Sequence, residues 1–266
     1  MRKSSCQFVF QRVYDVAALV EESIDNEGSL IELDWEDPEL LRGLAKFSKV
    51  STLHFYIYAM IAVEHRRDYR KNADMYEAEE IGDIERQFDA YSIKHIPYAA
   101  YASPIIPIDQ ARSREEDSFY QWFLTQERSF EELWEKLADE TFHLLFGNRS
   151  FLLKFNRAVA RYLEQETIRI PAEYLGSDGK FKRQPIPIWV RDAVYFRDRG
   201  RCVLCQVDLS GLLSTDRSDH FDHMVPLAAW GINDPGNIQL LCEACNLKKA
   251  AGEPTTGYRY PPWWSY

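Results

Sequence analysis

The chain has few cysteines, no long apolar run and no excess of positive charge. Five cysteines in 266 residues are too few for a disulfide scaffold, and Cys6 stands apart as a candidate buried thiol. The longest apolar run, Phe55 to Val63, is too short to span a bilayer. No N-terminal stretch combines the basic, apolar and small-residue parts of a secretory signal. We therefore expect a soluble cytoplasmic protein with no membrane partner.

The charge balance differs between the two ends of the chain. A net charge of −10 argues against a protein that coats nucleic acid by charge alone, because phosphate binding depends mainly on Lys and Arg. Residues 1–180 hold 22 Lys and Arg against 33 Asp and Glu, whereas residues 181–266 hold 10 against 9. A nucleic-acid function therefore stays open for the C-terminal part.

Hydrophobic periodicity predicts that the first part of the chain is mainly helical. Ser129 with Glu132 has the pattern of a capping box and predicts the start of one helix, and Ser150 predicts the start of the next. Apolar residues at three- and four-residue spacings follow both starts. Weaker periodicity of the same kind predicts helices in four further segments: 38–49, 52–67, 75–94 and 116–127. The sequence does not indicate the fold family or the task of this helical part.

Three segments are expected to be non-helical. A strand is predicted near 29–34, and an extended connection over 96–107, where Pro, Tyr and Ala are frequent. Gly, Pro, Lys and Ser are frequent over 171–185, a composition typical of an inter-domain linker. The sequence therefore predicts a mainly α-helical recognition or regulatory domain over 1–170, a linker, and a small α+β domain over 186–266.

Four cysteines of the second domain form two matched pairs, Cys202-x-x-Cys205 and Cys242-x-x-Cys245. A CxxC turn lets two thiolates reach one ion, and four sulfurs at the corners of a tetrahedron make a closed structural zinc site. The alternative is a redox dithiol, which leaves the second matched pair unexplained. We therefore predict Zn²⁺ as a structural cofactor.

The remaining elements of the second domain are predicted around these pairs. A short helix is expected from Trp189 to Asp198, a hairpin around Asp222, and a closing helix from Cys242. The tail from Tyr258 contains two tryptophans, Trp263 and its neighbour, after two prolines. We expect this tail to pack against its own protein, and stacking on nucleic-acid bases is the alternative.

A set of polar residues lies between and behind the cysteine pairs, in the segments DHMVPL and GNIQLLCEACN. His223 precedes Asn237 by 14 positions, and Asn237 precedes Asn246 by 9. Together with the lead-in IPIWVRDAVYFRDRGRCVLC and the Lys pair that follows, this pattern resembles the HNH endonuclease family, in its zinc-bearing ββα-metal form. The resemblance runs from Ile186 to Gly252.

The resemblance implies a role for each residue of this set. His223 would be the general base that takes a proton from the attacking water, a role suited to an imidazole. Asp222 and Asn246 would bind a catalytic Mg²⁺ or Mn²⁺ through oxygen atoms. Asn237 would fix the hairpin and hence the direction of His223. The plainer alternatives are a helix cap for Asn246 and an ordinary carboxylate at a strand end for Asp222.

Other polar residues of the domain are candidate nucleic-acid contacts. On a strand, His220 would share a side with Asp222 and be either solvated or close to phosphate. Lys and Arg commonly position a nucleic-acid backbone, and the candidates here are Arg191, Arg197, Arg199, Arg201, Lys248 and Lys249.

The leading hypothesis is an HNH-type endonuclease that hydrolyses DNA phosphodiester bonds, with RNA a less favoured substrate. Residues 1–170 would bind a protein partner or form a dimer, and the resemblance suggests restriction or antiviral defence as a setting. One alternative is a zinc-stabilised DNA-binding module that recruits partners through its acidic helical domain. Another is a nuclease subunit that is active only within a larger complex. An intact catalytic set argues against the binding module, which has no need of it.

Overall fold

The computed structural model shows a mostly helical protein with one small sheet near its C-terminus, as the sequence predicts. The structure describes residues 9–10, 12–25, 30, 33–102, 118–165, 168–211, 219–250 and 252–260. Within these ranges, none of the helices has the length and apolar character needed to cross a membrane.

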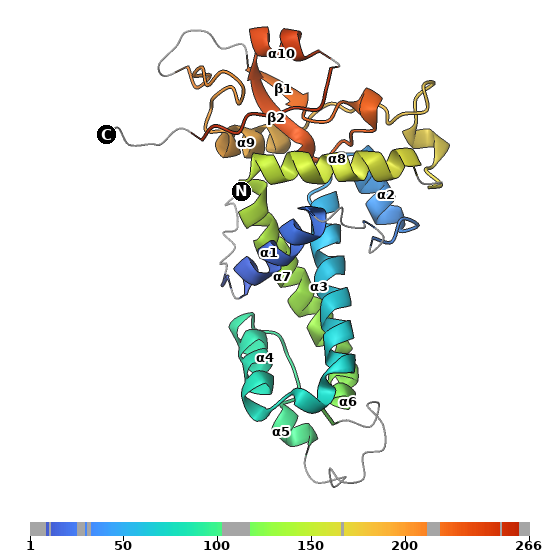
Figure 1. Ribbon diagram of the computed structural model, residues 1–266, viewed down its shortest axis with the longest axis vertical. Helices are drawn as coiled ribbons and strands as arrows, with labels where there is room; N and C mark the ends of the chain where they lie inside the picture. The colour runs from blue at the N-terminus through green and yellow to red at the C-terminus, as the bar shows by residue number, and fades with distance from the viewer. Residues whose placement is uncertain are drawn as a thin grey trace, which may run out of the picture. The chain divides into compact units, whose positions relative to one another are not determined.

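Ten α-helices and two β-strands are assigned in the described part of the chain (Figure 1). They are α1 (Val13–Asp25), α2 (Pro38–Ala45), α3 (Thr52–Lys71), α4 (Ala78–Ala90), α5 (Tyr98–Tyr101), α6 (Ser118–Thr125), α7 (Glu127–Phe146), α8 (Arg149–Gln165), α9 (Ile188–Arg197), β1 (Asp219–His223), β2 (Ile238–Cys242) and α10 (Glu243–Lys249). Internal contacts group them into two compact units. The first unit comprises Met1–Leu19 and Ile57–Phe142, and the second comprises Val20–Tyr56 and His143–Tyr266.

Aromatic side chains build the core of the first unit. Tyr69, Phe88 and Phe130 are each at most 4% exposed, and Phe130 packs edge-on against both of the others. Aromatic pairs in this geometry add about 0.5–1.5 kcal/mol beyond the area they bury. Glu140 is 2% exposed and accepts hydrogen bonds from the Tyr91 hydroxyl and from two backbone N–H groups at residues 9 and 10. The carboxylate therefore fastens an N-terminal segment to α7.

The predicted helices are present, but two of their starts differ from the prediction. α7 begins at Glu127 rather than at Ser129, whose hydroxyl donates instead to the carbonyl oxygen of Lys94. α8 begins at Arg149 rather than after Ser150, and the side-chain oxygen of Asn148 accepts the N–H of Phe151. Both predicted caps are wrong because the cap position depends on hydrogen-bond partners that the local pattern does not reveal.

Two of the predicted non-helical segments also need correction. The expected strand near 29–34 is absent at its described residues, where the N–H of Leu33 bonds to the carbonyl of Leu30 in a turn. Its other residues lie outside the described part. The expected extended connection contains the single helical turn α5, because two N–H groups bond back to the carbonyl of Pro97.

The segment 171–185, predicted as a linker, has a defined conformation. A short 3₁₀ turn, Ala172–Tyr174, leads into an antiparallel bridge between Leu175 and Phe181, and Phe181 is only 3% exposed. Gly179 adopts a left-handed conformation with φ 73° in the tight turn between the bridge residues. The division of the chain into domains on either side of this segment stays a prediction.

The second unit contains the predicted hairpin and closing helix. β1 and β2 are antiparallel, with His223 opposite Ile238 and Asp219 opposite Cys242. α9 packs against β2, and α10 packs against both strands (Figure 1). The apolar residues Val190, Val194, Val203, Ile238, Leu240 and Leu241 are buried together in the core between these elements. β1 therefore ends beside the start of β2, and α10 begins at the other end of the sheet, directly after Cys242.

Acid is expected to destabilise the protein, because His54 and His65 are buried. Burial lowers the pKa of His54 to about 3 and that of His65 to about 4, against about 6.5 in an unfolded chain. The unfolded state therefore binds protons that the native state does not, so stability is full above about pH 6.5 and falls as the pH drops toward 4. Thermal unfolding between these pH values should show a falling midpoint. His54→Gln should reduce that fall, and an unchanged pH dependence in the variant would contradict the assignment.

Candidate functional site

The four cysteines of the two CxxC pairs meet at one point. Their sulfur atoms all lie within 4.8 Å of one another, and the Sγ atoms of Cys205 and Cys242 are 3.7 Å apart. Four sulfurs about 2.3 Å from a tetrahedral zinc ion are separated by about 3.8 Å. The donor set and its spacing therefore fit a zinc ion, in agreement with the sequence prediction.

Backbone hydrogen bonds hold the first cysteine pair against the sheet. The N–H of Cys202 bonds to the carbonyl of Val207, and the N–H of Val203 bonds to the carbonyl of Leu240 in β2. Gly257, near the C-terminus, passes so close that a Cβ there would lie 1.7 Å from the carbonyl oxygen of Val203. The cysteine turn is thus enclosed by β2 on one side and by the C-terminal segment on another.

His223 ends β1 and is 3% exposed. Its Nε2 atom lies 3.3 Å from Oδ1 of Asn233. Burial lowers the pKa of His223 to about 4, and the smaller effects of Asn233 and Asp222 oppose this shift. The imidazole is therefore neutral at neutral pH, which is the form that can accept a proton.

Asp222 lies beside Lys249 of α10. Oδ2 of Asp222 is 2.8 Å from Nζ of Lys249, whose ammonium also donates to the carbonyl oxygen of His223 at 2.8 Å. Oδ2 of Asp222 is buried, and the Lys249 ammonium is its charged partner among the described residues. A carboxylate oxygen in a buried site that already attracts a cation has the chemistry of a ligand for a divalent ion.

Asn246 lies one turn before Lys249 in α10 and is half-buried. Residues three apart on a helix share a face. Because Lys249 reaches Asp222 and His223 from that face, Asn246 is placed on the side of α10 that packs against β1. An amide oxygen from Asn246 and a carboxylate oxygen from Asp222 suit a hard cation such as Mg²⁺.

Asn237 is fully buried and uses its whole side chain to hold the segment between the two strands. Its Oδ1 accepts the N–H of Val225, and its Nδ2 donates to the carbonyls of Val225 and Ile232. The carbonyl of Asn237 also accepts the N–H of Met224. The residues directly after His223 are therefore fixed to the start of β2.

The candidate phosphate contacts fall into different environments. Lys248 is exposed and Arg201 is half-buried, with a guanidinium that donates to the carbonyl of Gln206. Arg199 and Arg191 are exposed. The prediction for Lys249 is wrong, because its side chain is 2% exposed and pairs with Asp222. The prediction for Arg197 is wrong, because its side chain is 1% exposed and pairs with Asp198. His220 is half-buried, and the two tail tryptophans lie outside the described residues.

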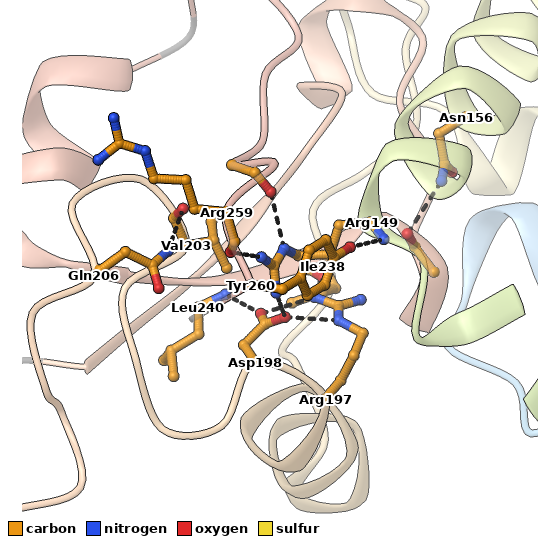
Figure 2. Close-up of polar contacts among 12 residues, drawn as sticks. Arg149, Asn156, Arg197, Asp198, Val203, Gln206, Ile238, Leu240, Arg259 and Tyr260 are labelled. Carbon is orange, nitrogen blue, oxygen red and sulfur yellow. Dashed lines mark hydrogen bonds and ion pairs between the residues drawn. The ribbon is translucent and has the colours of Figure 1, made fainter. Parts of the chain in front are cut away.

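The sequence analysis missed a buried ionic network centred on Asp198 (Figure 2). Asp198 is fully buried and accepts two hydrogen bonds from Arg197, one from the N–H of Leu240 and one from Arg149 of α8. Arg197 also donates to the carbonyl of Ile238. The end of α9 is thereby tied to β2, and both are tied to α8.

Arg149 extends this network to the C-terminal segment. Its guanidinium donates to the carbonyls of Gly257 and Arg259 and lies 4.1 Å from the ring centroid of Tyr260 (Figure 2). The hydroxyl of Tyr260 accepts the backbone N–H of Arg149 at 2.7 Å. In the sequence, the frequency of Arg near 197–201 was the one sign of this network. Arg149 of α8 gave no sign, because it lies far from Asp198 in the sequence.

Arg149→Met is expected to destabilise the protein by about 3–5 kcal/mol, since it removes one partner of a buried ion pair. Two carbonyl oxygens and part of the Asp198 carboxylate would also lose their donor. Arg157→Met, on the same helix, is the matched control, because Arg157 is exposed and bonds to a single carbonyl, that of Pro254. Urea unfolding should show a large loss of stability for the first variant and little for the second. Equal losses would contradict the importance of the network.

The fold and the cysteine cluster define a class of domain: a two-stranded sheet and a helix closed by a metal-binding cluster, which is the ββα-metal type. Residues 202–252 match the family model described as HNH endonuclease. The C-terminal part of this chain therefore carries an HNH domain, a family whose activity is endonucleolytic. Comparisons with curated proteins and with solved structures gave no match.

Proposed function

We propose that this protein is a metal-dependent endonuclease that hydrolyses phosphodiester bonds in DNA. The observation that carries the proposal is the placement of a buried, neutral His223 directly beside Asp222, whose carboxylate oxygen faces a positive charge, the Lys249 ammonium, at 2.8 Å. Both lie at the end of β1 in the segment that matches the HNH family. A stable fold has no need of such a pair, whereas hydrolysis needs a base beside a cation site.

Each residue of the site has a defined part in the proposed reaction. His223 takes a proton from the water that attacks the phosphorus, and Asp222 and Asn246 are the residues that would hold the divalent ion. When bound, such an ion offsets negative charge on the phosphate and on the departing oxygen. Asn237 holds the loop behind His223 and so fixes the direction of the base. Resemblance to the family implies products with a 5′-phosphate and a 3′-hydroxyl.

Cleavage of supercoiled plasmid, linear duplex and single-stranded RNA by the full chain tests this function. Mg²⁺ or Mn²⁺ should support nicking of the plasmid, and EDTA should abolish it, because one site cuts one strand. DNA should be cut in preference to RNA. No cleavage of any substrate with either metal, by a protein that retains its zinc, would favour the DNA-binding alternative.

A second candidate is a nuclease that is active only within a larger complex, and the charge of the chain favours it. The net charge is −10, and the C-terminal part is almost neutral, so free DNA should bind poorly. Residues 1–170 would then bind the protein partner or a second copy of the chain, in a setting such as restriction or antiviral defence. A salt titration of DNA binding tests this candidate, since tight and salt-resistant binding by the isolated protein would contradict it.

A further inference from the structure

Asn233 contacts His223 although it is not one of the four polar residues identified by the family resemblance. It lies in the loop between β1 and β2 and is fully buried. Its Oδ1 atom is 3.3 Å from Nε2 of His223, and among the described residues no other side chain is recorded within hydrogen-bond distance of that ring. The orientation of the proposed base therefore depends on which way the Asn233 amide points.

Two backbone carbonyls determine that orientation. Nδ2 of Asn233 donates to the carbonyl oxygens of Ala45 and Lys182, both at 2.9 Å. If the amide were turned over, its oxygen would face these two acceptors and its NH₂ group would face the histidine. Two hydrogen bonds would be lost in a buried site, which is costly. Oδ1 of Asn233 is therefore directed to His223.

This orientation selects one tautomer of His223. An amide oxygen can only accept a hydrogen bond, so Nε2 of the neutral imidazole must carry the proton. The lone pair then lies on Nδ1, the other ring nitrogen. A neutral imidazole takes a proton only on the nitrogen that carries the lone pair, so this tautomer makes Nδ1 the proton acceptor of the proposed base.

The acceptors that hold Asn233 lie outside the segment that matches the family. Ala45 is the last residue of α2, and the preceding carbonyl, that of Leu44, accepts the backbone N–H of Asn233 at 3.0 Å. The next residue, Asp234, accepts the N–H of Thr52 at the start of α3, at 2.8 Å. Residues 44–52 and Lys182 thus form a cradle around the loop that contacts the base.

We propose that Asn233 is a positioning residue that holds His223 in the tautomer with a proton on Nε2, and that the cradle of residues 44–52 and Lys182 belongs to the nuclease site. The effect on catalysis rests on the proposed nuclease function. The tautomer does not, because it follows from the hydrogen bonds alone.

Nitrogen NMR of the histidine rings in the full, zinc-loaded chain near pH 7.5 reads the tautomer directly, with His223 assigned by comparison with His223→Gln. The wild type should show a protonated Nε2 and an unprotonated Nδ1. Asn233→Ala should lose this preference. Asn156→Ala is the matched control, because Asn156 is an equally buried amide that bonds to the carbonyls of Leu152 and Gly236 and not to the histidine. A wild-type ring with its proton on Nδ1 would overturn the proposal, even if every variant failed to fold.

Kinetics separate this proposal from the proposed function. Asn233→Ala should lower kcat about 10- to 100-fold with little change in KM, a size typical of residues that orient a catalytic group. Asn156→Ala should lower stability and leave kcat unchanged. If wild type shows the expected tautomer but cuts no nucleic acid, the nuclease function fails and the positioning stands. If wild type cuts and Asn233→Ala cuts equally well with the same tautomer, the positioning is wrong and the nuclease function stands.

Discussion

His223→Ala is expected to lower the rate of DNA cleavage by about 100- to 10,000-fold, the contribution typical of a general base. The substitution removes the proton acceptor that the structure places, neutral and buried, beside Asp222. Metal binding should persist, because Asp222 and Asn246 are unchanged. Single-turnover cleavage of a plasmid at saturating Mg²⁺ measures the effect on chemistry without a contribution from product release.

The matched control is His220→Ala, on the same strand. Because strand residues alternate between faces, His220 lies on the opposite side from His223. We expect this variant to retain the same zinc content and to lose far less activity than His223→Ala, because His220 shares a side with Asp222 and would at most contact phosphate. Full activity of His223→Ala would show that His223 is not the base, and an equal loss in both variants would show that the substitutions act through the fold of the strand.

Removal of the zinc is expected to unfold the hairpin and α10. The cysteine cluster joins the turn at Cys202 to the end of β2 and to α10, and these elements share a small core. Zinc contributes about 10–16 kcal/mol to the folding of isolated zinc-finger peptides. This contribution is as large as the whole free energy of unfolding of an ordinary domain, which is about 5–15 kcal/mol. Chelation or Cys242→Ser should therefore make this part of the chain sensitive to proteolysis and abolish cleavage.

The control for this experiment is Cys6→Ser, which removes the cysteine that belongs to neither CxxC pair. This variant should retain one zinc per chain, as measured by elemental analysis, and its protease resistance. A protein that loses its zinc but retains its resistance and its unfolding midpoint would contradict a structural role for the ion. The measurement is independent of nuclease activity, so it remains informative if the chain cuts only in a complex.

Local patterns predicted much of the fold and the cluster of four cysteines. The CxxC spacing predicted a four-sulfur cluster because each pair makes a tight turn by itself, and the cluster is present. The hairpin around Asp222 and the helix starting near Cys242 were also predicted from short segments, and both are present. Helix starts were less well predicted, because the caps at Asn148 and near Ser129 depend on neighbouring groups.

The partners of the site came from distant parts of the chain, and no pattern indicated them. Arg149 reaches Asp198 across 49 residues, and Asn233 reaches Ala45 across 188. Buried amides and guanidinium groups must be hydrogen-bonded, but the sequence does not show which carbonyl will lie within hydrogen-bond distance. Arg197 looked like a surface charge for the same reason, and only its burial identified it as part of the network.

Short sequence patterns specify the chemistry of the C-terminal part: two CxxC turns, and an imidazole next to a carboxylate, each at a spacing that local structure sets. Tertiary structure decided how that chemistry is held. It placed Lys249 beside Asp222, directed the Asn233 amide to His223, and brought α2 and α8 against the HNH domain. The physical reason is that local backbone geometry sets contacts between residues a few positions apart. Contacts between distant residues form only when the whole core packs and its buried polar groups find partners.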